Sequence, residues 1–233
     1  MATNVIRGEV QLYEDFVGWD IIADKPEFAV DTDPAIEVVA TEPNGVVRIT
    51  MDAGQANIGG ILFGQTQWDI TNGIYVAARV RLSAIGTANE RVGVWLTDLQ
   101  EDTLSEYPFT MATTVATAAA DPNDAVGIFW EGDPTNASWY ALSQNTDALV
   151  VNGIGLQTVY KAPVANTWNL LEMDIAPGGL HAEFFVDGVN IYTYDGVTPV
   201  VADVPLILVW GCTEGATAIN YDLDEILIRS SRQ

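Results

Sequence analysis

Hydrophobic and polar residues alternate along much of the chain, which is the pattern of half-buried β-strands. Every second residue of segment 74–82 is apolar, whereas Tyr75, Arg79 and Arg81 fall between the apolar positions. Segment 169–175 alternates in the same way. The sequence therefore predicts a strand in each segment, with one face toward a core and the other toward solvent.

The dipeptide Asp187-Gly188 separates two further alternating runs, 180–186 and 189–194. A two-residue Asp-Gly between such runs predicts a tight β-hairpin. Residues 111–120 are rich in Ala and Thr and predict a loop or an edge strand, with a short helix as the alternative. The remaining predicted strands are separated by turn residues and cover 16–22, 36–40, 46–51, 58–63, 92–97, 126–130, 139–142, 156–160, 206–210 and 224–228.

More than ten short strands without a helical stripe predict an all-β protein, a two-sheet antiparallel β-sandwich. No Pro/Gly/Ser-rich linker divides the 233 residues, so we expect one domain at 13–233, preceded by an N-terminal arm at 1–12. Cys212, the one cysteine, lies beside an apolar run and is expected to be a buried small hydrophobe.

The charge balance excludes several kinds of partner. There are 32 acidic against 9 basic residues, a net charge of −23, which disfavours nucleic acid and anionic membranes. The longest apolar run, 204–210, is too short to span a bilayer. The first eight residues hold no apolar run of the secretory kind, so we expect no signal peptide. The acids act either as a solubilising coat or, in part, as Ca²⁺ ligands.

The order of these segments resembles the concanavalin A-like lectin/glucanase (laminin G-like) jelly-roll superfamily, over about residues 14–229. The resemblance implies a jelly-roll sandwich, and because that fold hosts lectins, hydrolases, adhesion modules and virion proteins, function has to be argued from sites. The matching stretches are Asp15-Phe16…Trp19, Ile74–Leu82, Val92-Gly-Val-Trp-Leu-Thr-Asp98, Ala125-Val-Gly-Ile-Phe129, Trp168–Ile175 followed by Phe184-Phe-Val-Asp-Gly188, and Tyr221-Asp-Leu-Asp-Glu-Ile-Leu-Ile228.

Within that superfamily, the chain looks most similar to stand-alone virion proteins of tailed phages. This implies a non-enzymatic structural protein, a capsid decoration or head-fibre protein made in the host cytoplasm and placed on the virion surface. Its expected partners are the major capsid protein or another virion protein, and further copies of itself in a trimer. The expected anchor is the N-terminal arm, through Val5, Arg7, Val10 and Leu12. The competing interpretation of this segment is a disordered terminus or a first edge strand of the domain itself.

The alternative function is a lectin-like carbohydrate-binding module that recognises surface glycans. Its candidate site is a polar, acidic loop flanked by aromatic residues, in which rings stack on a sugar while polar groups bind hydroxyls. The competing interpretation is a hairpin whose Trp residues belong to the core. The candidate residues are Trp130, Asp133, Asn136, Trp139 and Tyr140.

A glycan hydrolase is the third alternative, and the sequence argues against it. Retaining glucanases of this fold carry three acids on one strand, so that nucleophile and acid/base meet in the cleft. The nearest match, Glu172-Met-Asp174, has Ala176 or Pro177 where the third acid would stand. One histidine, His181, and one cysteine leave few groups for zinc or Ser-His-Asp chemistry. The sequence thus predicts no enzyme activity.

A metal site has one weak candidate. Asp222 and Asp224 share a strand face and offer oxygen ligands for Ca²⁺, although no contiguous D-x-D-x-D-G loop surrounds them. The competing interpretation is a strand that begins with solvated acids or with an Asp bonded to backbone amides. No other cofactor is expected.

Overall fold

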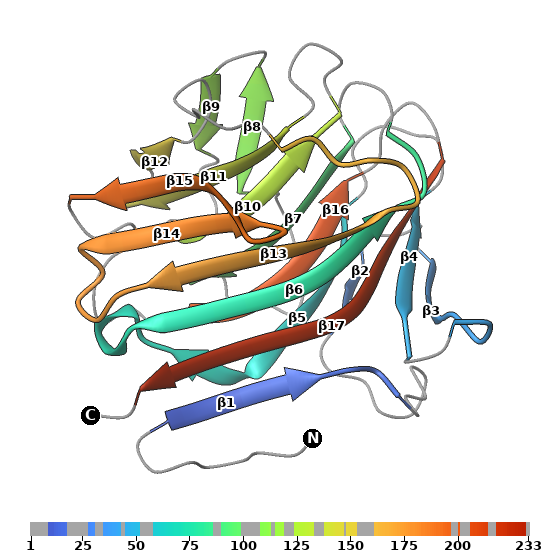
Figure 1. Ribbon diagram of the computed structural model, residues 1–233, viewed down its shortest axis with the longest axis horizontal. Helices are drawn as coiled ribbons and strands as arrows, with labels where there is room; N and C mark the ends of the chain where they lie inside the picture. Colours follow the sequence, from blue (N-terminus) through green and yellow to red (C-terminus); the bar gives the residue numbers. More distant parts are fainter. Residues whose placement is uncertain are drawn as a thin grey trace.

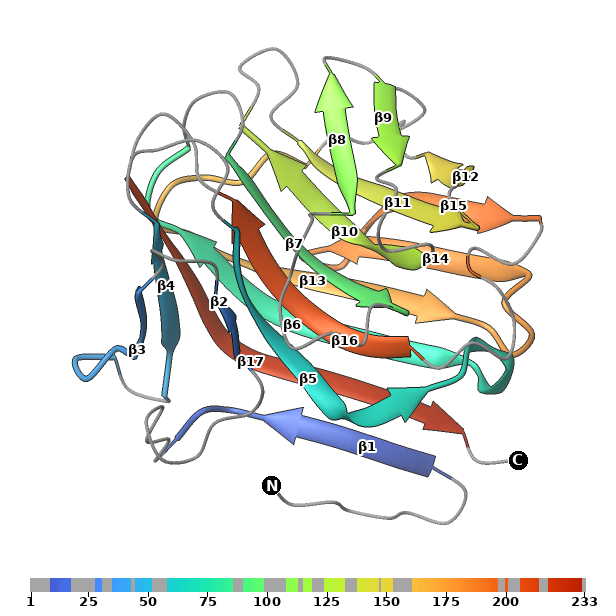
Figure 2. The ribbon, with the colours of Figure 1, turned by 180° about the vertical axis from the view of Figure 1, so that it is seen from behind.

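The computed structural model consists of two β-sheets packed face to face (Figures 1 and 2). It describes residues 9–17, 28–30, 35–42, 45–51, 58–85, 90–98, 108–112, 115–118, 124–132, 138–146, 148–152, 161–196, 200, 206–213 and 218–231. Among these residues the one helical element is a short 3₁₀ turn, η1 (Ile70–Asn72). None of them forms a helix with the length and hydrophobicity that crossing a bilayer requires.

Sheet A is the layer nearest the viewer in Figure 1. All of its neighbouring strands run antiparallel, and β1 (Glu9–Glu14) adds to it by pairing with β17. The order of the other described strands is β15 (Val189–Asp195), β14 (His181–Val186), β13 (Trp168–Ile175), β6 (Ile74–Leu82), β17 (Ile219–Ser231), β4 (Val47–Met51) and β3 (Ala35–Val38).

Sheet B is the layer nearest the viewer in Figure 2, and it is also antiparallel. A separate hairpin, β8 (Phe109–Ala112) and β9 (Val115–Ala118), lies beside it. The order of its described strands is β12 (Ala148–Asn152), β11 (Trp139–Asn145), β10 (Ala125–Glu131), β7 (Arg91–Thr97), β16 (Leu206–Thr213), β5 (Ile58–Trp68) and β2 (Phe28–Val30).

The main core lies between the sheets and is built by the alternation read from the sequence. In β6, buried and half-buried residues alternate from Ile74 to Leu82 without a break. Each apolar side chain buried this way contributes about 1.5–3 kcal/mol to folding. Cys212 of β16 is fully buried in the same core, as expected.

A second hydrophobic cluster covers the other face of sheet B. Phe129 and Trp130 are neighbours in β10 and point to opposite faces, so Trp130 joins the main core and Phe129 the second cluster. Phe109 of the β8–β9 hairpin packs edge-on against Phe129, with 4.8 Å between ring centroids. Trp95 on the same face is 1% exposed. The described central strands of sheet B therefore bury apolar residues on both faces.

The predicted fold class, a two-sheet antiparallel sandwich, is confirmed. The hairpin at Asp187-Gly188 is also confirmed, with φ of 50° and 72° at its two central residues, the left-handed pair that a type I′ turn requires. Segment 111–120 contributes to the β8–β9 hairpin, as the strand alternative predicted.

The start of the chain differs from the prediction. The first strand is Glu9–Glu14, and Phe16 follows it as a buried residue in the left-handed region (φ 56°), which ends the strand. Residues 9–12 of the expected free arm thus pair with β17, and Leu12 is 7% exposed and part of the core. Val10 shares this pairing. Val5, Arg7, residues 18–22 of the predicted strand 16–22 and the predicted strand 156–160 lie outside the described residues.

Candidate functional site

The aromatic residues of the predicted sugar-binding loop are core residues. Trp130 and Trp139 are fully buried between the sheets, and Tyr140 is 4% exposed within the second cluster. They lie on β10 and β11, which have a neighbouring strand on each side and apolar cover on each face. The expectation that these rings stack on a sugar is therefore corrected. Asp133 and Asn136 lie outside the described residues.

The charged residues at that end of sheet B are buried too. Glu131, the last residue of β10, is 5% exposed, and its carboxylate lies 3.4 Å from the guanidinium of Arg91 on β7. Glu90, directly before β7, is fully buried. The sequence pattern singled out none of these residues, because a charge at the end of a strand normally indicates solvent exposure.

The acid pair of β13 lies on the outer face of sheet A. Leu171, Met173 and Ile175 point into the core, so Glu172 and Asp174 point outward. The hydroxyl of Tyr75 donates to Glu172 over 2.6 Å, and burial together with this bond raises the pKa of Tyr75 to about 12. Tyr75 therefore remains a protonated donor at neutral pH.

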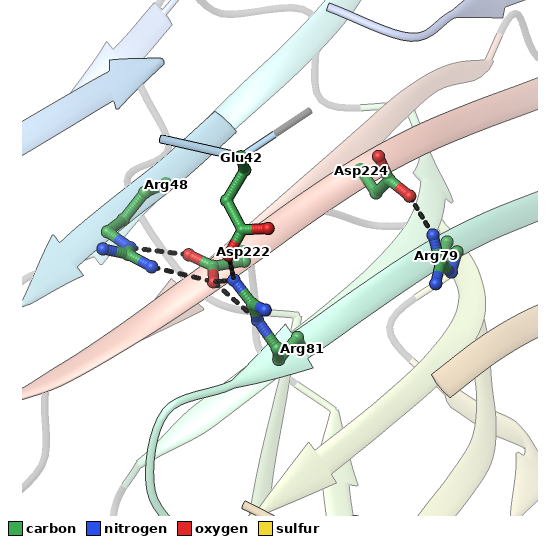
Figure 3. A network of polar contacts seen from close by, with 6 residues as sticks. All are labelled: Glu42, Arg48, Arg79, Arg81, Asp222 and Asp224. Atoms are coloured by element: carbon green, nitrogen blue, oxygen red, sulfur yellow. Dashed lines mark hydrogen bonds and ion pairs between the residues drawn. The ribbon is translucent and has the colours of Figure 1, made fainter. Parts of the chain in front are cut away.

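Asp222 and Asp224 face arginines rather than a metal ion (Figure 3). The carboxylate of Asp222 is 2% exposed and accepts from Arg48 at 2.7 and 3.0 Å and from Arg81 at 2.6 and 2.9 Å. Asp224 pairs with Arg79. These arginines occupy the oxygens that Ca²⁺ would need, so the assignment of Asp222 and Asp224 as calcium ligands is corrected. Within the described part of the chain, no three Asp, Glu, His or Cys residues are arranged to hold a metal.

Trp168 extends this network to β13. The guanidinium carbons of Arg79 and Arg81 lie 4.8 and 4.4 Å from the centroid of its indole ring. Cation–π contacts of this kind contribute about 0.5–1 kcal/mol at exposed sites. The Asp222 hydrogen bond raises the pKa of Arg48, so this guanidinium stays charged. The outer face of sheet A is thus held by paired charges that span β4, β17, β6 and β13.

A surface pocket of 180 Å³ opens on the same face, where β6 begins and β13 and β17 end. This is the left edge of the front sheet in Figure 1. Its volume is below the roughly 300–1,000 Å³ of drug-sized sites, so it suits one small ring rather than a long ligand. The polar and ring-bearing residues that line it include Asn72, Tyr75, Asp174, Pro177, Arg229 and Ser231.

Strand register brings the three central pocket residues into one row. Tyr75 is the cross-strand partner of Asp174 on one side and of Arg229 on the other. The guanidinium carbon of Arg229 lies 4.4 Å from the centroid of the Tyr75 ring. Within the described residues, the Asp174 carboxylate accepts no hydrogen bond and forms no ion pair. The row therefore presents the carboxylate of Asp174 as a hydrogen-bond acceptor beside the aromatic ring of Tyr75 and the guanidinium of Arg229.

Two turns fix the wall of the pocket. Gly73 has φ of 72°, and a Cβ there would lie 2.9 Å from Cδ of Pro177. The amide of Gly178 donates to the carbonyl of Thr71 over 3.1 Å, and the hydroxyl of Ser230 donates to the carbonyl of Gly73 over 2.7 Å. These contacts join the η1 turn to the β13–β14 turn and to β17, so the pocket is preformed.

No protein-family model matches the sequence, and no curated protein does. Solved structures do resemble the fold. Peanut lectin has a TM-score of 0.64 at 10% identity, with 96% of this chain and 97% of the lectin covered. The potassium-bound carbohydrate recognition domain of Emp46p has a TM-score of 0.59 at 8% identity, with 92% and 94% covered. The β-glucanase of Bacillus licheniformis has a TM-score of 0.55 at 10% identity, with 96% and 98% covered.

At these identities the likeness establishes the fold, a concanavalin A-like jelly roll. The neighbours include lectins as well as a glycan-cleaving enzyme. The fold therefore does not separate binding from catalysis, and the residues of the site have to do so.

Proposed function

We propose that the chain is a lectin-like carbohydrate-binding module without catalytic activity. The observation that carries the proposal is the preformed pocket at Tyr75, Asp174 and Arg229. Lectin sites combine an apolar ring surface with a few fixed polar groups. Here the carboxylate of Asp174, the amide of Asn72 and the backbone around Ser231 supply acceptors and donors for sugar hydroxyls. Fixed groups on a sheet avoid the entropy cost of ordering them on binding.

The environment of the acids supports binding over hydrolysis. Glycoside hydrolysis needs two carboxyl groups on either side of a scissile bond. Glu172 already accepts a hydrogen bond from the Tyr75 hydroxyl, and Ala176, directly after the strand, stands where a third acid would be. On sheet B, the described residues of the second hydrophobic cluster are buried under apolar cover and offer no open polar face for a glycan chain.

A glycan array that carries neutral, amino and acidic sugars tests the proposal. We expect the wild type to bind at least one glycan class, and Asp174→Asn to weaken that binding about tenfold, the loss that one charged hydrogen bond predicts. Glu37→Gln removes the same charge from exposed Glu37 of β3 and should bind like the wild type. An array without binding, or cleavage of a bound glycan, would contradict the proposal.

The role as a phage capsid decoration protein stays a prediction. None of the neighbours named above is described as a virion protein. Of the four expected anchor residues, Leu12 is a core residue and Val10 belongs to β1. Mass spectrometry of purified virions for this chain tests the role directly, and its absence from them would contradict it.

A further inference from the structure

The charges around the pocket are unequal. Glu183 of β14 is the cross-strand partner of Asp174, so two carboxylates lie directly opposite each other. Glu172 lies two residues before Asp174 on the same face. Among the described residues of this row, the permanent cation is Arg229, whose guanidinium lies over the Tyr75 ring. The row Glu183–Asp174–Tyr75–Arg229 therefore carries excess negative charge on its β14 side.

Facing carboxylates repel each other unless a cation lies between or beside them. Asn190 donates to Glu183 over 3.4 Å, and His181 lies 3.9 Å from it, so Glu183 has weak local partners. Within the described residues, Asp174 accepts no hydrogen bond and forms no ion pair, and His181 interacts with its charge only through space. The whole molecule adds to this bias, because a net charge of −23 raises the local concentration of cations and lowers that of anions.

We propose that this pocket binds a sugar that carries a free amino group, a de-N-acetylated hexosamine, through an ion pair between the ammonium and Asp174. The proposal rests on the lectin-like function argued above and names the ligand of the same site. The ammonium supplies a cationic partner for Asp174, the carboxylate among the pocket-lining residues. The ring of the sugar fills the remaining volume, where Asn72 and Ser231 lie within reach of its hydroxyls.

This chemistry separates three ligand classes by charge. A charge-assisted N⁺–H···O⁻ bond is about twice as strong as a neutral one, so the free amine should be preferred over its acetamide. An acidic sugar would approach Asp174 and Glu183 with like charge and would depend on Arg229 instead. A neutral sugar would bind without strong dependence on the charge of either residue.

Titration calorimetry at pH 6 and about 0.15 M salt tests the proposal with two probes of equal length, a glucosamine oligomer and the matching N-acetylglucosamine oligomer. We expect the amine form to bind at least tenfold more tightly. Asp174→Asn should weaken it about ten- to a hundredfold, whereas Glu37→Gln should leave it unchanged. Unaltered melting temperatures in both variants show that the fold is retained.

The outcomes separate this inference from the proposed function. Equal binding of both oligomers, with loss in Asp174→Asn, overturns the amino-sugar preference and leaves the carbohydrate-binding function standing. Binding of an acidic sugar also overturns the preference, if Arg229→Gln abolishes that binding and Asp174→Asn leaves it intact. If Asp174→Asn does not weaken binding of the amine oligomer, the oligomer is attracted only by the overall negative charge of the protein. That result overturns the assignment of the binding site to Asp174. Absence of binding to any glycan on the array contradicts both.

Discussion

Single residues decide whether an aromatic side chain serves the core or a ligand. Trp130 and Trp139 flank a polar loop in the sequence, yet both rings are fully buried between the sheets. The strand period puts Trp130 on the same face as Val126 and Ile128, and that face is the core. An aromatic next to a loop is therefore no sign of a sugar platform until the face of its strand is known.

Trp130→Ala should lower the free energy of unfolding by about 3–5 kcal/mol, because it leaves a large cavity between the sheets. Urea denaturation followed by circular dichroism measures the change. Leu180→Ala is the matched control, since Leu180 is 60% exposed and its truncation should change stability by less than about 0.5 kcal/mol. A Trp130→Ala protein of wild-type stability would show that this ring is not part of the core.

His181 gives a second residue-scale prediction. Its hydrogen bond to Asp195 raises the pKa of the imidazole above 6.5, burial lowers it slightly, and the charges of Asp195, Glu183 and Asp174 raise it further. The protonated form is thus favoured by the fold. Its contribution to stability is complete below pH 6.5 and is lost as the pH rises through the raised pKa.

An NMR titration of this one histidine measures the effect without overlap from other imidazoles. We expect a midpoint above 6.5 in the wild type and a lower midpoint in Asp195→Asn. Glu37→Gln, which acts on a distant strand, should leave the midpoint unchanged. A wild-type midpoint at or below 6.5 would contradict the contact between His181 and Asp195.

At the scale of elements, paired charges tie neighbouring strands of sheet A. Asp222 of β17 receives Arg48 from β4 and Arg81 from β6, and Arg81 also donates to Glu42 over 2.8 Å (Figure 3). One buried carboxylate thereby joins three strands. Removal of a buried partner is more destabilising than removal of an exposed one, because it leaves charge without compensation.

Asp222→Asn should therefore cost about 2–3 kcal/mol of unfolding free energy, below the full loss for a buried pair because both arginines retain some solvent contact. Glu42→Gln breaks a more exposed pair on the same Arg81 and should cost less than about 1 kcal/mol. Chemical denaturation of both variants provides the comparison. Equal losses would mean that burial of Asp222 does not set its contribution.

The sequence could predict β6 and the β14–β15 hairpin because their patterns are local. Strict alternation predicted β6 from its first residue to its last, Ile74–Leu82, and Asp187-Gly188 predicted the turn. Strand β1 was foreseen only as an alternative for the N-terminal arm, because its residues pair with β17, more than 200 residues away in the chain. Nothing in a local window reveals such a partner.

The candidate pocket could not be predicted for the same reason. Tyr75, Asp174 and Arg229 come from three distant segments, and only the register of β6, β13 and β17 places them in one row. Periodicity did indicate that Tyr75 and Asp174 point outward from their strands, whereas Arg229 lies just beyond the predicted strand 224–228. The missing information was which outward residues face one another, which depends on long-range pairing.

At the scale of the whole molecule, the arrangement of charge explains how so acidic a chain folds. Four of the nine basic residues, Arg48, Arg79, Arg81 and Arg229, lie on the outer face of sheet A. Three of them neutralise the two buried aspartates of β17 and Glu42. Bases are thus concentrated where acids would otherwise be desolvated, and a large excess of acids has no basic partner to neutralise it.

Added salt should therefore raise the melting temperature. At a net charge of −23, like charges repel over long distances, and the screening length falls from about 30 Å at 0.01 M to about 10 Å at 0.1 M salt. The Asp222 pairs are screened much less, because that carboxylate is 2% exposed. Relief of repulsion should thus outweigh weakening of ion pairs.

Calorimetric melting between 0.01 and 0.5 M NaCl measures the trend, and KCl at equal ionic strength controls for a specific cation. Asp222→Asn should show a rise of similar size from a lower starting temperature. A flat or falling wild-type response would mean that local pairing, rather than repulsion among the remaining acids, dominates the electrostatics of the fold.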